Sequence, residues 1–315
     1  MIWVTWRQHR FEGVWSLVFV AAMTAALSFV TWEAGHPGCP AGGPTGFCLP
    51  NDPLGFLAQN IMRLNLVQYG LVVLPALAGA FIGAPLVARE IENGTHRLAW
   101  TLGVTRTRWI VSKLALIFIP LIGAAALVGI LEVILINRMG TQGNHWDWFD
   151  QQAPLTVAAT VFALALGVAA GALIGKSIPA MAVTLIGVVA TRFVLGVFVR
   201  AHYVTPLLYS SHDPAALGNS QALNPTAWWL DEPTYQDAAG HTISQAEALR
   251  ISATGNVPPP DALAAYWRDH GISIVQYYQP GDRFWTFQTI ESGILLVLTV
   301  VLLGFALFWV ARRIV

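Results

Sequence analysis

Three ionisable residues, Glu132, Arg192 and Glu291, lie within long apolar runs of the sequence. A charged side chain at the middle of a membrane helix costs about 2.5–3.5 kcal/mol on insertion scales, so such residues are expected to have a partner or a function. Arg192 could form an ion pair with Glu132 or with Glu291. The three residues could line a polar substrate path in the outer half of the membrane, lock helices together, or reach the membrane surface with their charged ends. The sequence leaves these alternatives open.

The segment 171–177, GALIGKS, has the composition of a phosphate-binding loop. It is one residue too short for that motif, Ala170 stands where the first glycine should be, and the segment ends an apolar run. The eight His residues lack metal-ligand spacing, so no metal site is predicted. We therefore predict that the chain is not an enzyme and binds no cofactor itself.

Cys39 and Cys48 are the only cysteines, too few for a zinc cage or a disulfide-rich scaffold. The topology predicted below places both outside the membrane, where a disulfide can persist. They could form a disulfide or remain two free thiols in a flexible loop.

The composition indicates a membrane protein. Hydrophobic residues make up 55% of the 315 residues and charged residues only 11%, whereas soluble domains carry about 25% charged residues. The formal net charge is zero, which gives no basic field for binding nucleic acid. The 13 Trp residues suit a protein with two lipid–water interfaces.

Six apolar runs are long enough to span a membrane, because a spanning helix needs about 20 apolar residues. They are residues 14–32, 66–88, 114–136, 155–174, 180–199 and 286–310. A tight turn at residues 175–179 separates the fourth run from the fifth. The first run is longer than the apolar region of a signal peptide and is not followed by a clear cleavage site, so we interpret it as a retained helix.

The distribution of basic residues predicts that both ends of the chain are cytoplasmic, and we expect the protein to lie in the plasma membrane. With the N-terminus inside, the short cytoplasmic segments hold most of the Lys and Arg residues: Arg7, Arg10, Arg89, Arg97, Arg106, Arg108, Lys113, Lys176, Arg312 and Arg313.

We therefore predict an all-α polytopic membrane protein with four parts. Residues 1–13 form an amphipathic helix in the inner interface, and residues 14–200 hold the first five spans. Residues 201–285 form a small extracellular α+β domain, and residues 286–315 hold the last span and a cytoplasmic tail. Glycines at spacing four, Gly79 with Gly83 and Gly167 with Gly171 and Gly175, predict close helix contacts within one subunit or between two.

The extracellular segment is too long for a simple connection. Residues 228–234 and 272–278 have strand-like composition, residues 260–269 (PDALAAYWRD) predict a short helix, and Gly240 predicts a turn. Pro280 is expected to end the second strand just before the last span.

The loop at residues 88–113 is the largest soluble feature predicted on the inner side. Gly94 should end the preceding helix, and Thr95 could cap a short helix over residues 96–102. Gly103 suits the end of that short helix, and Thr105 could cap the next helix, which would continue into the third span. On spacing alone, a plain positively charged loop is an equal alternative.

This loop resembles the loop between spans two and three of ABC-2-type permeases. The matching residues are Arg89, Glu90, Gly94, Thr95, Arg97, Leu98, Gly103, Val104, Arg106, Arg108, Trp109 and Lys113. The ending Tyr278-Gln279-Pro280 and Arg283-Phe284-Trp285 is similar to a subset of actinobacterial-type ABC-2 permeases.

The resemblance implies that residues 96–102 form a coupling helix that docks on a cytoplasmic ATPase subunit, which binds ATP and Mg²⁺. The residues implied in this coupling are Glu90, Glu92, Gly94, Thr95, His96, Arg97, Leu98, Trp100, Thr101, Gly103, Arg106, Arg108, Trp109 and Lys113. It also implies an exporter permease that pairs with a second copy of itself, as a homodimer, or with a homologue. Two other functions stay open: a membrane-anchored extracellular binding or sensor protein, and an ion-coupled secondary transporter.

Overall fold

The computed structural model describes residues 70, 72–95, 105–138, 145–213, 224–244, 246–248, 250 and 260–312. The predicted interfacial helix, the first predicted span and both cysteines lie outside these residues. The chain divides into two compact units. The helical unit comprises Met1–Thr141, Phe149–Leu195 and Gln288–Val315, and the sheet unit comprises Gln142–Trp148 and Gly196–Phe287.

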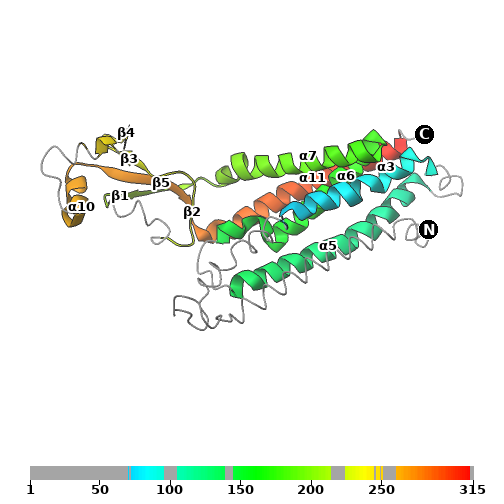
Figure 1. Cartoon of the computed structure of the whole chain (residues 1–315), viewed down its shortest axis with the longest axis horizontal. Helices are drawn as coiled ribbons and strands as arrows, with labels where there is room; N and C mark the ends of the chain where they lie inside the picture. The colour runs from blue at the N-terminus through cyan, green and yellow to red at the C-terminus, as the bar shows by residue number, and fades with distance from the viewer. Residues whose placement is uncertain are drawn as a thin grey trace, which may run out of the picture. The chain divides into compact units, whose positions relative to one another are not determined.

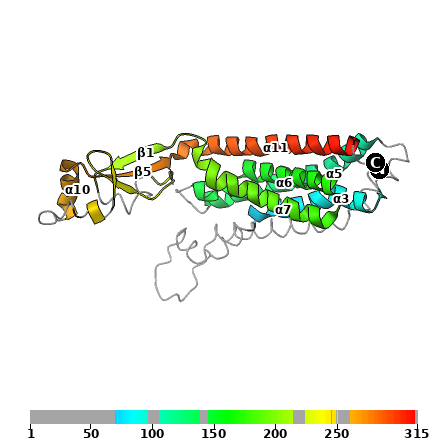
Figure 2. The ribbon, with the colours of Figure 1, turned by 90° about the horizontal axis from the view of Figure 1, so that it is seen from above.

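The described part of the chain contains five helices that are long and apolar enough to cross a membrane. They cover Val72–Glu92, Arg106–Ile134, Ala153–Ile174, Ser177–His202 and Gly281–Arg312. These helices correspond to the second to sixth predicted spans, with ends displaced by up to eight residues. Figures 1 and 2 show α3 (Ala84–Glu92), α5 (Arg106–Arg138), α6 (Ala153–Ile174), α7 (Ser177–Val194) and α11 (Phe284–Arg312) lying side by side.

The predicted glycine contacts lie within this one chain, between α6 and the helix that contains Gly79 and Gly83. The π-helical turn η1 (Gly79–Gly83) and α3 pack against α6. A Cβ atom added at Gly83 would lie 2.8 Å from the carbonyl oxygen of Leu164, and one at Gly167 would lie 2.7 Å from the amide nitrogen of Ala84. Since the neighbouring atoms belong to the backbone, the glycines are what allows these helices to approach so closely.

The helix ends follow the predicted turn chemistry. Gly94 adopts φ +70° just after α3, and Gly175 adopts φ +66° just after α6, a conformation that glycine tolerates best. The amide of Arg108 donates to the hydroxyl of Thr105 over 3.3 Å, so Thr105 caps α5 as predicted. The predicted turn at residues 175–179 is shorter than expected, because α7 already begins at Ser177.

Short irregular helices connect the long ones. They are the 3₁₀ helix η2 (His145–Gln151) before α6, the π-helical η3 (Leu195–Val199) and 3₁₀ η4 (Arg200–His202) after α7, and the 3₁₀ η6 (Gly281–Arg283) before α11.

The sheet unit contains a five-stranded antiparallel sheet in the order β1-β5-β3-β4, with β2 also paired to β5. Its strands are β1 (Leu207–Ser211), β2 (Trp228–Trp229), β3 (Thr234–Gln236), β4 (Thr242–Ile243) and β5 (Ser273–Gln279). Helix α10 (Pro260–Asp269) contributes Trp267, which packs with Tyr235 and Ile274 in the core of this unit.

The sequence predicted part of this sheet. The helix at residues 260–269 is observed as α10, and the strand at 272–278 is observed as β5, one residue later. The single strand predicted at 228–234 is wrong: β2 and β3 are separate, and both pair with β5 at different positions along it. Pro233 lies between them, and proline cannot donate a ladder hydrogen bond. Gly240, at φ +81°, lies in the turn between β3 and β4.

Candidate functional site

The predicted coupling helix itself lies outside the described residues, which stop at Thr95 and resume at Thr105. We call residues 96–104 the connecting segment. The implied coupling residues His96, Arg97, Leu98, Trp100, Thr101 and Gly103 fall within it. Of the other implied residues, Glu90 and Glu92 belong to α3, Gly94 and Thr95 follow the end of α3, and Arg106, Arg108, Trp109 and Lys113 belong to α5. The structure shows what holds these two flanks.

A buried ion pair joins the two flanks to each other. The Lys113 ammonium of α5 pairs with the Glu90 carboxylate of α3, and the two side chains are 3% and 10% exposed. The Lys113 nitrogen also lies 4.6 Å from the centre of the Trp109 ring, a favourable cation–π distance. Because removing one partner of a buried pair leaves an uncompensated charge, this contact holds α3 and α5 together at the base of the connecting segment.

Each flank is also tied to another long helix. One carboxylate oxygen of Glu92 accepts hydrogen bonds from the backbone N–H and the hydroxyl of Ser177, at 3.0 and 2.9 Å, at the first residue of α7. The Arg106 guanidinium donates to the carbonyl oxygen of Ala311 in the last turn of α11 over 3.2 Å. The segment predicted to couple is therefore linked through its flanks to α7 and α11.

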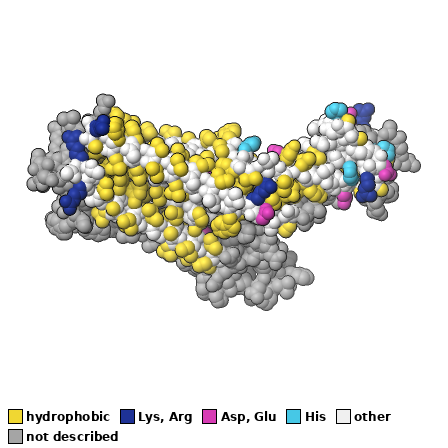
Figure 3. All heavy atoms as spheres, turned by 180° about the vertical axis from the view of Figure 1, so that it is seen from behind, with side chains coloured by type: hydrophobic (Ala, Val, Ile, Leu, Met, Phe, Trp, Pro, Cys, Tyr) yellow, Lys and Arg dark blue, Asp and Glu magenta, His cyan; other side chains and the backbone are white. Residues whose placement is uncertain are grey.

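Basic side chains gather where these helix ends meet. They are Arg89, Arg106, Arg108, Lys176 and Arg312, all exposed or half-buried, and we call this region the basic end. Figure 3 shows Lys and Arg side chains concentrated at one end of the apolar helical surface. Such an excess is typical of the cytoplasmic face of a membrane protein.

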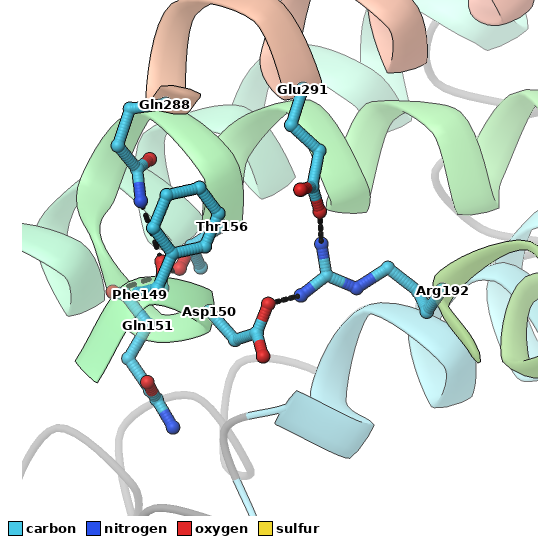
Figure 4. A network of polar contacts seen from close by, with 7 residues as sticks. All are labelled: Phe149, Asp150, Gln151, Thr156, Arg192, Gln288 and Glu291. Carbon is cyan, nitrogen blue, oxygen red and sulfur yellow. Dashed lines mark hydrogen bonds and ion pairs between the residues drawn. The ribbon is translucent and has the colours of Figure 1, made fainter. Parts of the chain in front are cut away.

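A second polar site lies within the helices, where Arg192 of α7 bridges two carboxylates. Its guanidinium lies 3.3 Å from a carboxylate oxygen of Glu291 in α11 and 2.7 Å from one of Asp150 in η2 (Figure 4). The side chains of Glu291, Arg192 and Asp150 are 0%, 14% and 35% exposed. We call these three residues the ion triad; one cation faces two anions.

Neighbouring hydrogen bonds hold η2 in place beside the triad. The side-chain amide of Gln288 in α11 donates to the backbone carbonyl oxygen of Phe149 over 2.7 Å (Figure 4). The hydroxyl of Thr156 donates to the backbone carbonyl oxygen of Gln151 over 3.0 Å. Asp150 is thus positioned by backbone contacts on both sides of it.

The structure therefore selects between the predicted partners of Arg192. Glu291 is a partner, as one alternative proposed, and Glu132 is not. Glu132 is buried in α5 at 2% exposure, and neither of its carboxylate oxygens has a hydrogen-bond partner among the described residues. Asp150 was missed, because it lies in a short polar stretch that the sequence presents as a connection before the fourth span.

Comparison with known proteins identifies the family. The sequence model described as ABC-2 membrane transporter related matches residues 13–200, more than half of the chain. The chain belongs to the ABC-2 membrane transporter related family. Searches of curated proteins and of solved structures find no match.

This ABC-2 family membership confirms the resemblance seen in the sequence, whereas the actinobacterial-type subset stays a prediction. The matched region includes the connecting segment, both of its flanks, and the Asp150 and Arg192 members of the ion triad. A protein of this family is a membrane component of an ABC transporter and not itself a catalyst. The sheet unit follows the matched region, apart from residues 142–148 and 196–200.

Proposed function

We propose that this chain is the transmembrane permease subunit of an ATP-driven ABC-2-type exporter. Its helices form the translocation path together with a second copy of the chain or a homologue. A separate cytoplasmic ATPase subunit binds ATP and Mg²⁺ and docks on the connecting segment. The protein lies in the plasma membrane with both ends in the cytoplasm, and the sheet unit lies outside the cell.

The observation that carries this proposal is the family match across residues 13–200, which includes the connecting segment. The contacts of its flanks support the mechanism. A force applied to a loop moves a membrane domain only when the loop is joined firmly to the spans. Here Glu90, Glu92 and Arg106 join the flanks to α5, α7 and α11.

The charge distribution supports the proposed orientation. The basic end lies at the same ends of α3, α5, α7 and α11 as the connecting segment, since Glu92 contacts Ser177 and Arg106 contacts Ala311. If basic residues mark the cytoplasmic face, the connecting segment faces the cytoplasm, where an ATPase can reach it.

Co-purification tests the proposal. The tagged chain is expressed with the ABC ATPase encoded nearest to it, extracted in mild detergent and purified by the tag alone. The ATPase should be retained by the wild-type chain. It should be lost when Leu98→Asp and Trp100→Ala are introduced together into the connecting segment.

The matched control is Arg268→Ala, an exposed change on α10 of the sheet unit, which should retain the ATPase. A wild-type chain that folds but never retains an ABC ATPase would contradict the proposal. That outcome would favour a membrane-anchored binding or sensor protein, or an ion-coupled transporter.

A further inference from the structure

Helix α7 connects the two polar sites described above. Its first residue, Ser177, is held by Glu92 beside the connecting segment, and Arg192 near its other end belongs to the ion triad. Arg192 lies 15 positions after Ser177, which corresponds to about 22 Å at 1.5 Å per residue. Both residues therefore lie on one helix, Ser177–Val194.

One face of α7 runs from the first site to the second. Ala180, Thr184 and Val188 are buried at a spacing of four residues, and Arg192 continues the same row. The hydroxyl of Thr184 donates to the carbonyl oxygen of Ala180, which keeps that side chain within its own helix. The row is thus closely packed along its length, as expected for a helix that moves as a rigid element.

Between α3 and α7 the buried packing near Ser177 centres on small side chains. Ala84 and Ala88 of α3 meet Ala180 of α7 and Ala170 of α6, and the partly buried Ile174 and Met181 pack against this cluster. These apolar contacts are not directional, since each atom pair contributes only about 0.1–0.2 kcal/mol. The two hydrogen bonds of the Glu92 carboxylate are directional and charge-assisted. They are the contact by which a displacement of the end of α3 would pull on α7.

We infer that Glu92 and Ser177 form a mechanical tie that transmits movement of the connecting segment along α7 to Arg192 and so changes the contacts within the ion triad. Glu92 and Ser177 are positioning residues in this account. The inference rests on the proposed function, since the ATPase supplies the movement. It adds the route by which the movement reaches the far side of the helical unit.

Ser177 offers a specific perturbation of the tie. The residue before it, Lys176, has an extended backbone (φ −129°, ψ 131°), which is compatible with a following proline. Ser177 is the first helical residue, where proline is tolerated. The change Ser177→Pro therefore removes both donors to Glu92 while keeping a backbone that α7 can adopt. Ser177→Thr is the matched control, because threonine keeps both donors.

The test uses the permease–ATPase complex with Cys39→Ser and Cys48→Ser. Spin labels at Val194→Cys in α7 and Leu296→Cys in α11, both 46% exposed, report the distance between these helices. Labelled chains are diluted with unlabelled chains, so that only distances within one chain are measured. Double electron–electron resonance compares the nucleotide-free complex with the complex trapped by ATP and vanadate.

We expect a nucleotide-dependent change of distance in the wild type and in Ser177→Thr, and its loss in Ser177→Pro. ATPase retention and ATP hydrolysis should persist in Ser177→Pro, which a general folding defect would not allow. If Ser177→Pro does not yield a folded complex, Glu92→Ala takes its place, because it removes the acceptor of both hydrogen bonds and Glu92 is exposed. A smaller change of distance in a Glu92→Ala complex that still retains the ATPase supports the tie.

The inference would be overturned if a folded Ser177→Pro complex showed the same nucleotide-dependent change of distance as the wild type. The same result in Glu92→Ala would overturn it where Ser177→Pro does not fold. A wild-type complex without any nucleotide-dependent change would overturn it as well. Failure of the wild-type chain to retain an ATPase is a different result, which contradicts the proposed function itself.

Discussion

Replacing Arg192 with Met should destabilise the helical unit mainly through Glu291. The Glu291 side chain is 0% exposed, so losing its cation leaves a buried charge, a change that costs about 3–5 kcal/mol. The contact to Asp150 contributes less, because Asp150 is 35% exposed and water compensates for it; exposed pairs contribute about 0–1 kcal/mol. Asp150→Ala should therefore cost about 1 kcal/mol or less.

The double variant Arg192→Met with Glu291→Met separates the ion pair from the packing. Replacing both members of a buried pair by apolar residues is often neutral, so the double variant should lie within about 1 kcal/mol of the wild type. The interaction energy of the cycle should then be about 3 kcal/mol, at the upper end of the range for residues in contact.

The free energy of unfolding is measured by SDS titration in mixed micelles, followed by Trp fluorescence. A double variant as unstable as Arg192→Met alone would refute this reasoning, and so would an Arg192→Met variant as stable as the wild type. An Arg192→Met chain that folds normally but loses export would instead assign the triad to the substrate path, the alternative raised by the sequence.

Three further predictions concern other contacts. Gly167→Val should lower the free energy of unfolding by about 1–3 kcal/mol, because its side chain would meet the backbone of the neighbouring helix, whereas Gly293→Ala, with open space around it, should not; SDS titration compares them. Lys113→Met should cost about 3–5 kcal/mol by the same titration, and adding Glu90→Leu should recover most of it, since no charge then remains buried; no recovery would contradict the pairing. The pKa of Asp237 is lowered, chiefly by the hydrogen bond from a backbone amide of its own turn, so its stabilisation of the turn between β3 and β4 is present above the unfolded-state pKa of about 3.9. This contribution should be lost as the pH falls through the lower folded-state pKa, and hydrogen exchange in the turn should show a smaller pH dependence in Asp237→Ala.

The sequence predicted the helices well because membrane spans are recognised from one local property, length of apolar sequence. It also placed the ends of α3, α6 and the start of α5, since Gly94, Gly175 and Thr105 act through short-range backbone geometry. The helix α10 and the strand β5 were found for the same reason, from composition bounded by turn residues.

The contacts that carry the mechanism could not be read in the same way. Glu92 and Ser177 are 85 residues apart, and Asp150 and Arg192 are 42 apart, so their meeting depends on how the helices pack. Asp150 and Ser177 also lie in short polar stretches that resemble ordinary connections. Strand β1 was missed because Leu207–Ser211 becomes a strand by pairing with β5, which is a property of two distant segments.

The central claim is that an ATPase docks on the connecting segment from the cytoplasm. It is tested most directly by placing the photo-cross-linker p-benzoylphenylalanine at Trp100 of the connecting segment, with Trp285, an exposed residue at the start of α11, as the control position. Irradiation of membranes that contain both subunits should join the chain to the ATPase from position 100 and not from position 285. Cross-linking from neither position, or labelling of a cysteine at position 100 by a membrane-impermeant reagent added outside the cell, would contradict the account.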